Sequence, residues 1–465
     1  MLIILAVSLH SISCRFLYPI HLSTPKNPFQ RPKPIPSSIE QYLLPQEIAQ
    51  TDVKTRTYPN GMRVVSEHVT GASSLALGLW VKAGSRDESA KTNGIAHFIE
   101  HVVFKGTAGR TMREIMRSIE SRGGYLNAFT TKEHTCFYTW TRTIHLEEAV
   151  SLLFDLAIRP KFSEKDIQNE KSVIIEEING LEDEPDELVF DLFEREIFGK
   201  NPLSRPIIGT QKTVGRFDRK TLTAFHKKHY LASEIVIVAS GSHSHDDLFR
   251  SINKAIRHVK PSIARKSAKK NPFPPLKKMV QEFPRAAGQQ AHIILGRRAP
   301  GIHAKRHLPI TALITIAGAG MSSRLNLRLR EDLGLAYDAT AFYSPFEEVG
   351  AVGLYVATAI DNRDRVVREM RKIARNLTKS PISKIELERA KEQMIGGLVL
   401  PMESVTNRMM RSAQNELYFG GYHPIERDVE KIAKLTLEEV RAEAEKLFAD
   451  EKSLMLVSVV PASPD

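Results

Sequence analysis

Cysteine is scarce in this chain of 465 residues, which contains only Cys14 and Cys136. Two cysteines can form at most one disulfide, so a disulfide framework is excluded as the organising principle of the chain. The same scarcity suits a reducing compartment. Long apolar runs are lacking as well. The run at residues 2–9 is far shorter than the roughly 20 residues that span a bilayer, and we expect no stable membrane span.

Acidic residues are missing from the N-terminal region up to Glu40, and this region allows three interpretations. The apolar run, followed by Ser11 and Ser13, has features of a signal-peptide core, although no Lys or Arg precedes it. The acid-poor, serine-containing composition also fits an organelle transit peptide. The third interpretation is an extension of residues 1–50 without a targeting role.

Positive charge is in modest excess, with 66 Lys and Arg against 54 Asp and Glu, and much of it lies in residues 251–280. This segment contains nine Lys or Arg and no acidic residue, and it includes a proline-rich stretch. Such a composition predicts a linker between two domains. Since aromatic residues are not interleaved with the basic ones, we expect no nucleic acid partner.

Hydrophobic periodicity predicts a similar mixture of strands and helices on both sides of this linker. Before it, residues 76–83 indicate a buried strand and residues 146–158 an amphipathic helix. After it, residues 352–357 indicate a strand and residues 363–377 a helix. We therefore predict an α+β fold with two similar domains, each a largely antiparallel sheet packed by helices. The expected domains are residues 51–250 and 281–465.

The segment NGIAHFIEHVVFKG at residues 93–106 holds two histidines four positions apart. Residues at this spacing lie one above the other on a helix, so His97 and His101 can present ring nitrogens to one ion. Glu100 points the same way, and Phe104 shares this stripe. The Glu100 carboxylate is placed to accept a proton from a metal-bound water and to pass it to a leaving amine. This H-x-x-E-H pattern is the inverzincin motif.

A third protein ligand is needed, and a carboxylate is usual beside two histidines. The run NEKSVIIEEING at residues 169–180 supplies the candidates. Glu170 and Glu177 share a helix face with two isoleucines, whereas Glu176 lies about 100° around the helix and is expected to be solvated. Because Glu170 and Glu177 are about 10.5 Å apart along the axis, both can hardly contact one ion. We interpret Glu170 as a residue that supports the site.

These motifs together resemble the M16 family of metallopeptidases, which includes pitrilysin, insulin-degrading enzyme and the mitochondrial processing peptidase. The matching stretches are GIAHFIEHVVFKGT, GGYLNAFTTKEHTCFY, NEKSVIIEEI, NPLSRPIIGT and GAGMSSRLNLRLREDLGLAY. The length resembles the shorter, two-domain branch that is similar to the processing peptidase. The resemblance implies two domains that face each other around a peptide chamber, with residues 251–280 as the hinge.

The resemblance also implies roles for individual residues at the metal. One zinc ion per chain would be bound by His97, His101 and Glu177, with Glu100 as general base and Glu170 in support. The spacing of 177 − 101 = 76 residues between His101 and Glu177 fits the family and favours Glu177 over its neighbour.

Substrate contacts are implied in the same way. Asn127 and Ala128 match family positions that line the peptide groove, where an edge strand can take up an extended peptide. We expect Phe104 to contribute to this groove. Arg330 and Tyr337 match a pair that reaches the substrate from the second domain, and both can donate hydrogen bonds to a developing oxyanion.

The expected function is a zinc-dependent endopeptidase that hydrolyses unfolded peptides or protein segments. The alternative is a non-catalytic core or partner subunit of a processing-peptidase-like complex, and the complete set of motif residues favours the enzyme. Besides the substrate, the expected partner is a second copy in a homodimer, or a related non-catalytic subunit in a heterodimer. The bacterial cytoplasm is the favoured compartment, with export to the periplasm and the mitochondrial matrix as alternatives.

Overall fold

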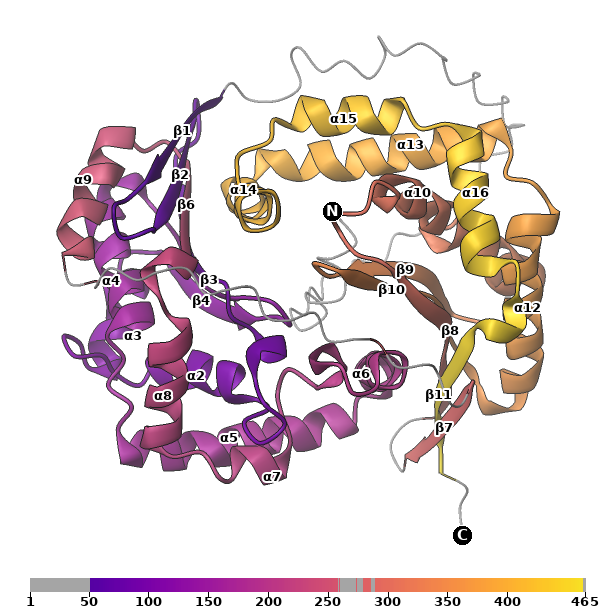
Figure 1. The fold of residues 1–465 in the computed structure, drawn as a ribbon, viewed down its shortest axis with the longest axis horizontal. Helices are drawn as coiled ribbons and strands as arrows, with labels where there is room; N and C mark the ends of the chain where they lie inside the picture. The colour runs from indigo at the N-terminus through magenta and orange to yellow at the C-terminus, as the bar shows by residue number, and fades with distance from the viewer. Residues whose placement is uncertain (1–50, 258, 260–272, 274–278, 286–288, 463–465) are drawn as a thin grey trace, which may run out of the picture.

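The computed structural model describes residues 51–257, 259, 273, 279–285 and 289–462. The expected N-terminal extension and most of the expected linker lie outside these residues. Two mixed sheets packed with helices make up the described part, as the sequence predicts, and Figure 1 shows them on opposite sides of the molecule. None of the described helices is long and apolar enough to cross a membrane.

The first sheet has six strands in the order β1-β2-β6-β3-β5-β4. All neighbouring strands pair antiparallel except β2 with β6. Strand β4 therefore lies at one edge. The strands are β1 (Thr51–Thr57), β2 (Arg63–Val69), β3 (Leu75–Val81), β4 (Tyr125–Thr130), β5 (Thr135–Thr141) and β6 (Ile235–Gly241).

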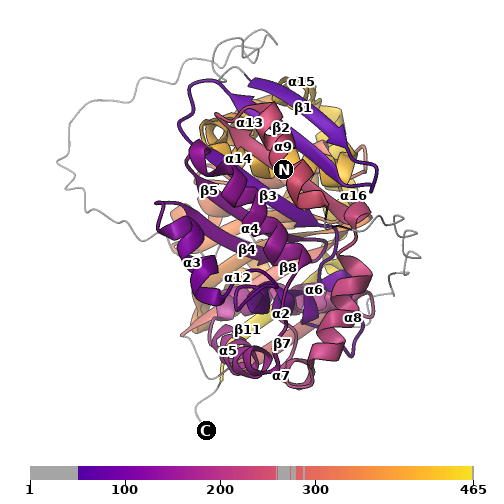
Figure 2. The same cartoon turned by 90° about the vertical axis from the view of Figure 1, so that its left-hand side faces the viewer.

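Helices cover the outer face of this sheet (Figure 2) and enclose the first core. They are α2 (Ile95–Val103), α3 (Met112–Glu120), α4 (Leu146–Ile158), α5 (Glu164–Glu182), α7 (Gln211–Val214), α8 (Arg219–His229) and α9 (His245–Ile256). Helix α9 continues past the domain end expected at residue 250. The reason is its apolar face, because Leu248, Phe249 and Ile252 are buried in the first core.

The second sheet has five strands in the order β7-β11-β8-β10-β9, and only β11 and β7 pair in parallel. The strands are β7 (Val280–Arg285), β8 (Gln290–Pro300), β9 (Asp338–Pro345), β10 (Val349–Ala359) and β11 (Met455–Pro461). Its helices are α10 (His307–Gly318), α11 (Arg324–Asn326), the π-helical η6 (Leu327–Asp332), α12 (Arg363–Lys379), α13 (Lys384–Val399), α15 (Ile425–Ala433) and α16 (Leu437–Phe448).

Short 3-10 turns connect these elements. They are η2 (Ser85–Asp87), η3 (Thr143–His145), η4 (Pro202–Ser204), η5 (Ala232–Glu234), η7 (Ile360–Asn362), η8 (Leu400–Glu403) and η9 (Glu451–Ser453).

Each half contributes one helix that packs on the sheet of the other half. Helix α6 (Pro185–Phe198) comes from the first half, but its Val189 and Phe193 share a core with Ile294 of β8 and Val457 of β11. Helix α14 (Val405–Phe419) comes from the second half and packs on β3 and β6, beside which it lies in Figure 1. The sequence predicts two domains joined by a linker, and this exchange of helices is an additional connection that it does not predict.

Ion pairs and a hydrogen bond also connect the two halves. Arg408 of α14 lies 3.1 Å from Glu67 of β2, and the side chains of both are almost completely buried. Arg63 pairs with Glu416 at 2.8 Å, and the Tyr418 hydroxyl donates to Glu133 at 2.7 Å. The peptide chamber expected between the halves stays a prediction.

Candidate metal centre

Helix α2 separates its apolar and polar residues onto two faces, as the periodicity predicts. Ile95, Phe98 and Ile99 are completely buried and anchor the helix on the first core. His97 and Glu100 lie on the other face and stay partly exposed. The helix contains no glycine or proline that would bend it, so the polar face keeps a regular helical spacing.

His97, His101 and Glu177 come together in one group. Each offers one ligand atom, and these atoms lie within 4.8 Å of one another. The Nε2 atoms of His97 and His101 lie 3.8 Å and 3.6 Å from the two Glu177 carboxylate oxygens. Tetrahedral ligands on bonds of about 2.1 Å lie about 3.4 Å apart, so this spacing fits a zinc ion. Glu177 rather than Glu176 joins the group, as we expected.

Glu170 lies on α5 behind His101 and is almost completely buried. Its carboxylate is 3.4 Å from His101 Nδ1 and 2.8 Å from Lys105 Nζ. Burial raises the pKa of Glu170, but the hydrogen bonds from His101 and Lys105 outweigh it and hold the pKa below the ordinary value. The carboxylate therefore stays charged and can orient the His101 ring, as supporting carboxylates do at zinc sites.

Glu100 stands beside the group without belonging to it. Its carboxylate accepts a hydrogen bond of 2.6 Å from the Thr130 hydroxyl at the end of β4. Burial raises the pKa of Glu100 to about 7, and the Thr130 hydrogen bond lowers it only in part. A carboxylate of this kind can take up and release a proton near neutral pH.

The two histidines differ in their protonation. Burial, followed by the charge of His101, lowers the pKa of His97 to about 3, so its ring is neutral at physiological pH. Burial also lowers the pKa of His101, but the surrounding carboxylates, Glu170 above all, raise it overall. Burial raises the pKa of Glu177. Two imidazoles and a carboxylate form the donor set that zinc accepts in peptidases, and a bound cation would favour the neutral rings and the ionised carboxylate.

The predicted groove residues lie at or near the edge strand. On β4, Asn127 accepts a hydrogen bond from the Ala128 amide and donates one to the Tyr125 hydroxyl. The Ala128 side chain is 8% exposed and packs in the first core, so its backbone is the part that could pair with a peptide, and its place in the groove stays a prediction. Phe104 is half-buried at the end of α2, where it packs on the same core.

Arg330 and Tyr337 lie together in the second half. The Arg330 guanidinium is 5.7 Å from the centre of the Tyr337 ring, and Tyr337 is 81% exposed. Within the described ranges, neither makes a hydrogen bond or an ion pair with the histidines or glutamates of the group. Arg330 also lies 3.7 Å from the Glu331 carboxylate, and the reach of both side chains to a substrate stays a prediction.

Three further residues surround the centre that sequence reasoning did not single out. Thr130 binds Glu100, Lys105 binds Glu170, and Glu88 accepts hydrogen bonds at the start of α2. Thr130 follows Asn127 and Ala128 in a stretch already matched to the family, which is a usable signal. Lys105 also lies in a matched stretch, GIAHFIEHVVFKGT, whereas Glu88 carried no signal in the sequence, because only the folded chain shows what it contacts.

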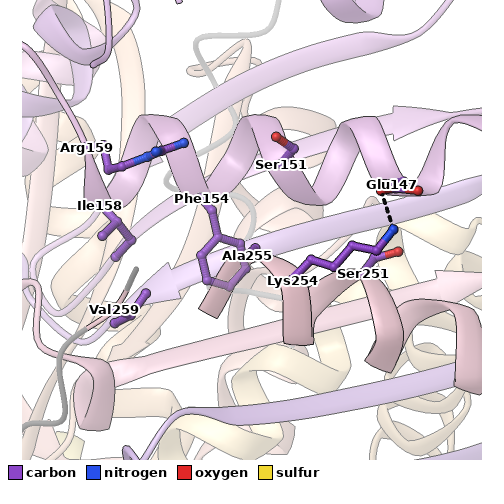
Figure 3. Close-up of a pocket in the computed structure, with 9 residues that line it drawn as sticks. All are labelled: Glu147, Ser151, Phe154, Ile158, Arg159, Ser251, Lys254, Ala255 and Val259. Carbon is purple, nitrogen blue, oxygen red and sulfur yellow. Dashed lines mark hydrogen bonds and ion pairs between the residues drawn. The ribbon is translucent and has the colours of Figure 1, made fainter. Parts of the chain in front are cut away.

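A separate hollow of about 180 Å³ lies between α4 and α9 (Figure 3), where Lys254 and Glu147 pair at 2.8 Å. None of the predicted site residues lines it. A second carboxylate group, formed by Glu133, Glu347 and Glu348, is bridged by Arg86. Because Arg86 pairs with two of these carboxylates and Lys82 with the third, the histidine-containing group is the stronger candidate for a metal centre.

Comparison with known proteins agrees with this choice. The model of the insulinase family, peptidase family M16, matches residues 63–211, and that of the peptidase M16 inactive domain matches residues 216–394. The chain is 33% identical to the uncharacterized zinc protease YmxG of Bacillus subtilis over 406 residues, which are 87% of this chain and 98% of the relative. It is 34% identical to an uncharacterized zinc protease of Mycobacterium leprae over 398 residues, which are 84% and 88% of the two chains.

Solved structures show the same fold. A protease from Helicobacter pylori matches with a TM-score of 0.80 and 20% identity, covering 89% of this chain and 100% of the other. A peptidase M16 inactive domain from Pseudomonas fluorescens matches with a TM-score of 0.80 and 19% identity, covering 89% and 99%. Together with the family models and the curated relatives, these matches show that the chain belongs to the M16 family of peptidases.

Proposed function

We propose that this protein is a zinc-dependent endopeptidase that cleaves unfolded peptides or protein segments. The observation that carries the proposal is the group of His97, His101 and Glu177, with Glu100 beside it. The relatives named as zinc proteases support the same activity. When bound, one zinc ion per chain would act as a Lewis acid on the scissile carbonyl and lower the pKa of the attacking water.

Glu100 is the general base of the proposed reaction. Its carboxylate takes the proton from the attacking water and later delivers it to the nitrogen of the leaving amine. Without the metal, burial raises the pKa of Glu100 to about 7, so this carboxyl group can exchange a proton near neutral pH. The Thr130 hydroxyl fixes one carboxylate oxygen, which leaves the other free to reach the water.

The substrate would bind as an added strand. Strand β4 is the outer strand of the first sheet, and its last residue, Thr130, contacts Glu100. A peptide paired with this edge would therefore pass the general base, and backbone pairing accepts many sequences. In this proposal Asn127 holds the peptide, and Arg330 and Tyr337 donate hydrogen bonds to the developing oxyanion.

The test measures zinc per chain and hydrolysis of a quenched fluorescent peptide for the wild type and for Glu100→Gln. We expect about one zinc in both proteins, cleavage by the wild type alone and loss of cleavage with a chelator. A wild type that binds zinc but cleaves nothing would support a partner subunit, either a second copy or a related non-catalytic chain. A wild type without zinc affinity would contradict the proposed peptidase activity and support the alternative, a non-catalytic core subunit.

A further inference from the structure

The first turn of α2 lacks a conventional cap. Its N-cap residue is Gly94, which has a φ of 91° and no side chain to accept hydrogen bonds from the first free amides. The acceptor comes from Glu88 instead. One carboxylate oxygen of Glu88 accepts from the Gly94 amide at 2.8 Å, and the other accepts from the Ala96 amide at 2.9 Å.

Glu88 is itself held from two directions. Its side chain is 5% exposed, and it accepts a third hydrogen bond of 3.0 Å from the Asn93 side chain. The Asn93 amide also donates to the Pro206 carbonyl at 2.8 Å, and Arg205 donates to the Glu88 carbonyl at 2.6 Å. The loop around Pro206 therefore fixes both the carboxylate and the turn that it caps.

Close backbone contact completes this arrangement. A β-carbon on Gly94 would lie 2.6 Å from the Ile208 carbonyl oxygen, and one on Gly209 would lie 2.6 Å from the Asn93 carbonyl oxygen. Two glycines with positive φ thus let the backbones touch. These contacts belong to the stretch NPLSRPIIGT, which the sequence matches to the family but which the proposed mechanism leaves without a role.

The position of this turn matters for the metal centre. His97 follows Ala96 directly, and α2 has only nine residues, so its first turn sets the rotation of the whole helix. The apolar face holds α2 on the core, but apolar contacts are not directional. The hydrogen bonds to Glu88 are directional, and they set where the polar face points.

We propose that Glu88 is a positioning residue of the metal centre, which fixes the first turn of α2 and thereby the orientation of His97, Glu100 and His101 toward Glu177. Its effect on catalysis depends on the proposed function, whereas its effect on the helix and on metal affinity does not. The substitution that tests it is Glu88→Gln, because an amide of the same shape turns one acceptor into a donor that faces an N–H group.

The experiment compares Glu88→Gln with the wild type and with Glu67→Gln. Glu67 is a matched control, since it is a buried carboxylate of the same half that accepts from Arg408 and Ser240, away from α2. Hydrogen exchange of the α2 amides is measured in the metal-free proteins, zinc affinity by chelator competition, and kcat and KM by peptide hydrolysis. Asn93→Ala serves as a second, milder variant in case Glu88→Gln does not fold.

For Glu88→Gln we expect about tenfold faster exchange in α2, about 10- to 100-fold weaker zinc binding and a similar fall in kcat with little change in KM. Asn93→Ala should change the same quantities in the same direction by a few-fold. The control should lose stability but keep α2 exchange and zinc affinity. Unchanged α2 exchange, or faster exchange with unchanged zinc affinity, would overturn the proposal. A wild type that does not cleave would instead contradict the proposed function, while the exchange and zinc data would still decide the role of Glu88.

Discussion

Helix α2 of the first half and helix α10 of the second half are each the first described α-helix of their half, and they follow strands β3 and β8. Every residue of α10 from Pro309 to Gly318 is buried, and the hydroxyls of Thr311 and Thr315 donate to carbonyls one turn back. Helix α2 buries only one face and leaves His97, Glu100 and His101 partly exposed. A layered fold needs only buried apolar faces, whereas a metal centre needs one face that stays uncovered.

Glu88 and Glu100 of the first half also differ from Glu386 of the second half in the direction in which their surroundings shift the pKa. In the first half, burial raises the pKa of Glu88 and of Glu100 to about 7, because hydrogen bonds compensate only part of the lost solvation. In the second half, hydrogen bonds to Arg324 and Ser383 more than offset burial and lower the pKa of Glu386 to about 2. Glu386 is therefore a fixed charge, as Glu170 of the first half is, whereas the pKa values of Glu88 and Glu100 lie near neutral pH.

The largest effect that we expect tests whether the first half alone holds the metal. Glu177→Gln should lower zinc affinity and peptidase activity by at least ~10³-fold, because it removes a ligand rather than a residue behind one. Glu176→Gln is the matched control, since Glu176 is the exposed neighbour outside the ligand group. Zinc titration and peptide hydrolysis measure both variants. Equal losses in the two variants would show that zinc binding and activity depend on the helix as a whole and not on the Glu177 carboxylate oxygens.

The next effect concerns the contact between the halves. Arg408→Met should lower the free energy of unfolding by about 3–5 kcal/mol, because it leaves the Glu67 carboxylate buried without its cation. Denaturant unfolding measures the loss. Arg408→Met combined with Glu67→Leu should recover most of it, since two apolar side chains leave no uncompensated charge. Failure of the double variant to recover would mean that shape, and not charge, joins α14 to the first sheet.

A smaller effect tests whether the second half takes part in the chemistry. If Tyr337 donates to the oxyanion, Tyr337→Phe should lower kcat about 10²-fold with zinc content unchanged. The side chain is 81% exposed, so loss of its hydroxyl should leave the melting temperature unchanged. Steady-state kinetics and zinc analysis check both points. An unchanged kcat would confine the chemistry to the first half and leave the second half a structural role.

The sequence predicts those parts of the site that follow from local geometry. His97, Glu100 and His101 lie within one helical turn and a half, so their shared face follows from the helical period alone. Glu177 is distant in sequence; the helical period placed it on the inward face and Glu176 off that face, and the family spacing then implied it as the third ligand. Glu88 could not be predicted, because two of its hydrogen-bond donors are backbone amides. Only the structure shows that Gly94 is the N-cap of α2 and that these amides therefore need an acceptor from elsewhere.

The fold, like the site, can be predicted from the sequence only in part. Periodicity predicts amphipathic helices and strands, and it predicts two largely antiparallel sheets. It cannot say which sheet an apolar helix face will cover, since any apolar surface satisfies the pattern. Helices α6 and α14 therefore pack on the sheet of the opposite half without a local signal that predicts it.

The smallest effect that we expect tests whether Glu386 stabilises the fold through its charge, in contrast to Glu88 and Glu100, whose pKa values are raised by burial. Arg324 donates to both Glu386 oxygens at 2.7 and 3.0 Å, and the folded pKa of about 2 lies below the ordinary 4.5. A lowered folded pKa gives stability that is present above pH 4.5 and is lost as the pH falls toward 2. Glu386→Gln should therefore cost about 1–2 kcal/mol at pH 7, after allowance for partial exposure, and progressively less below pH 4.5.

Glu439→Gln is the control for this measurement, because Glu439 caps α16 through Thr436 in the same way as Glu386 caps α13 through Ser383. No arginine contact of Glu439 occurs in the described part of the chain, so its loss should be smaller and should lack the guanidinium contribution. Urea unfolding of both variants at pH 7 and pH 3 makes the comparison. A cost for Glu386→Gln that does not change with pH would show that Glu386 acts through packing, and the contrast between the halves would then rest on α2 alone.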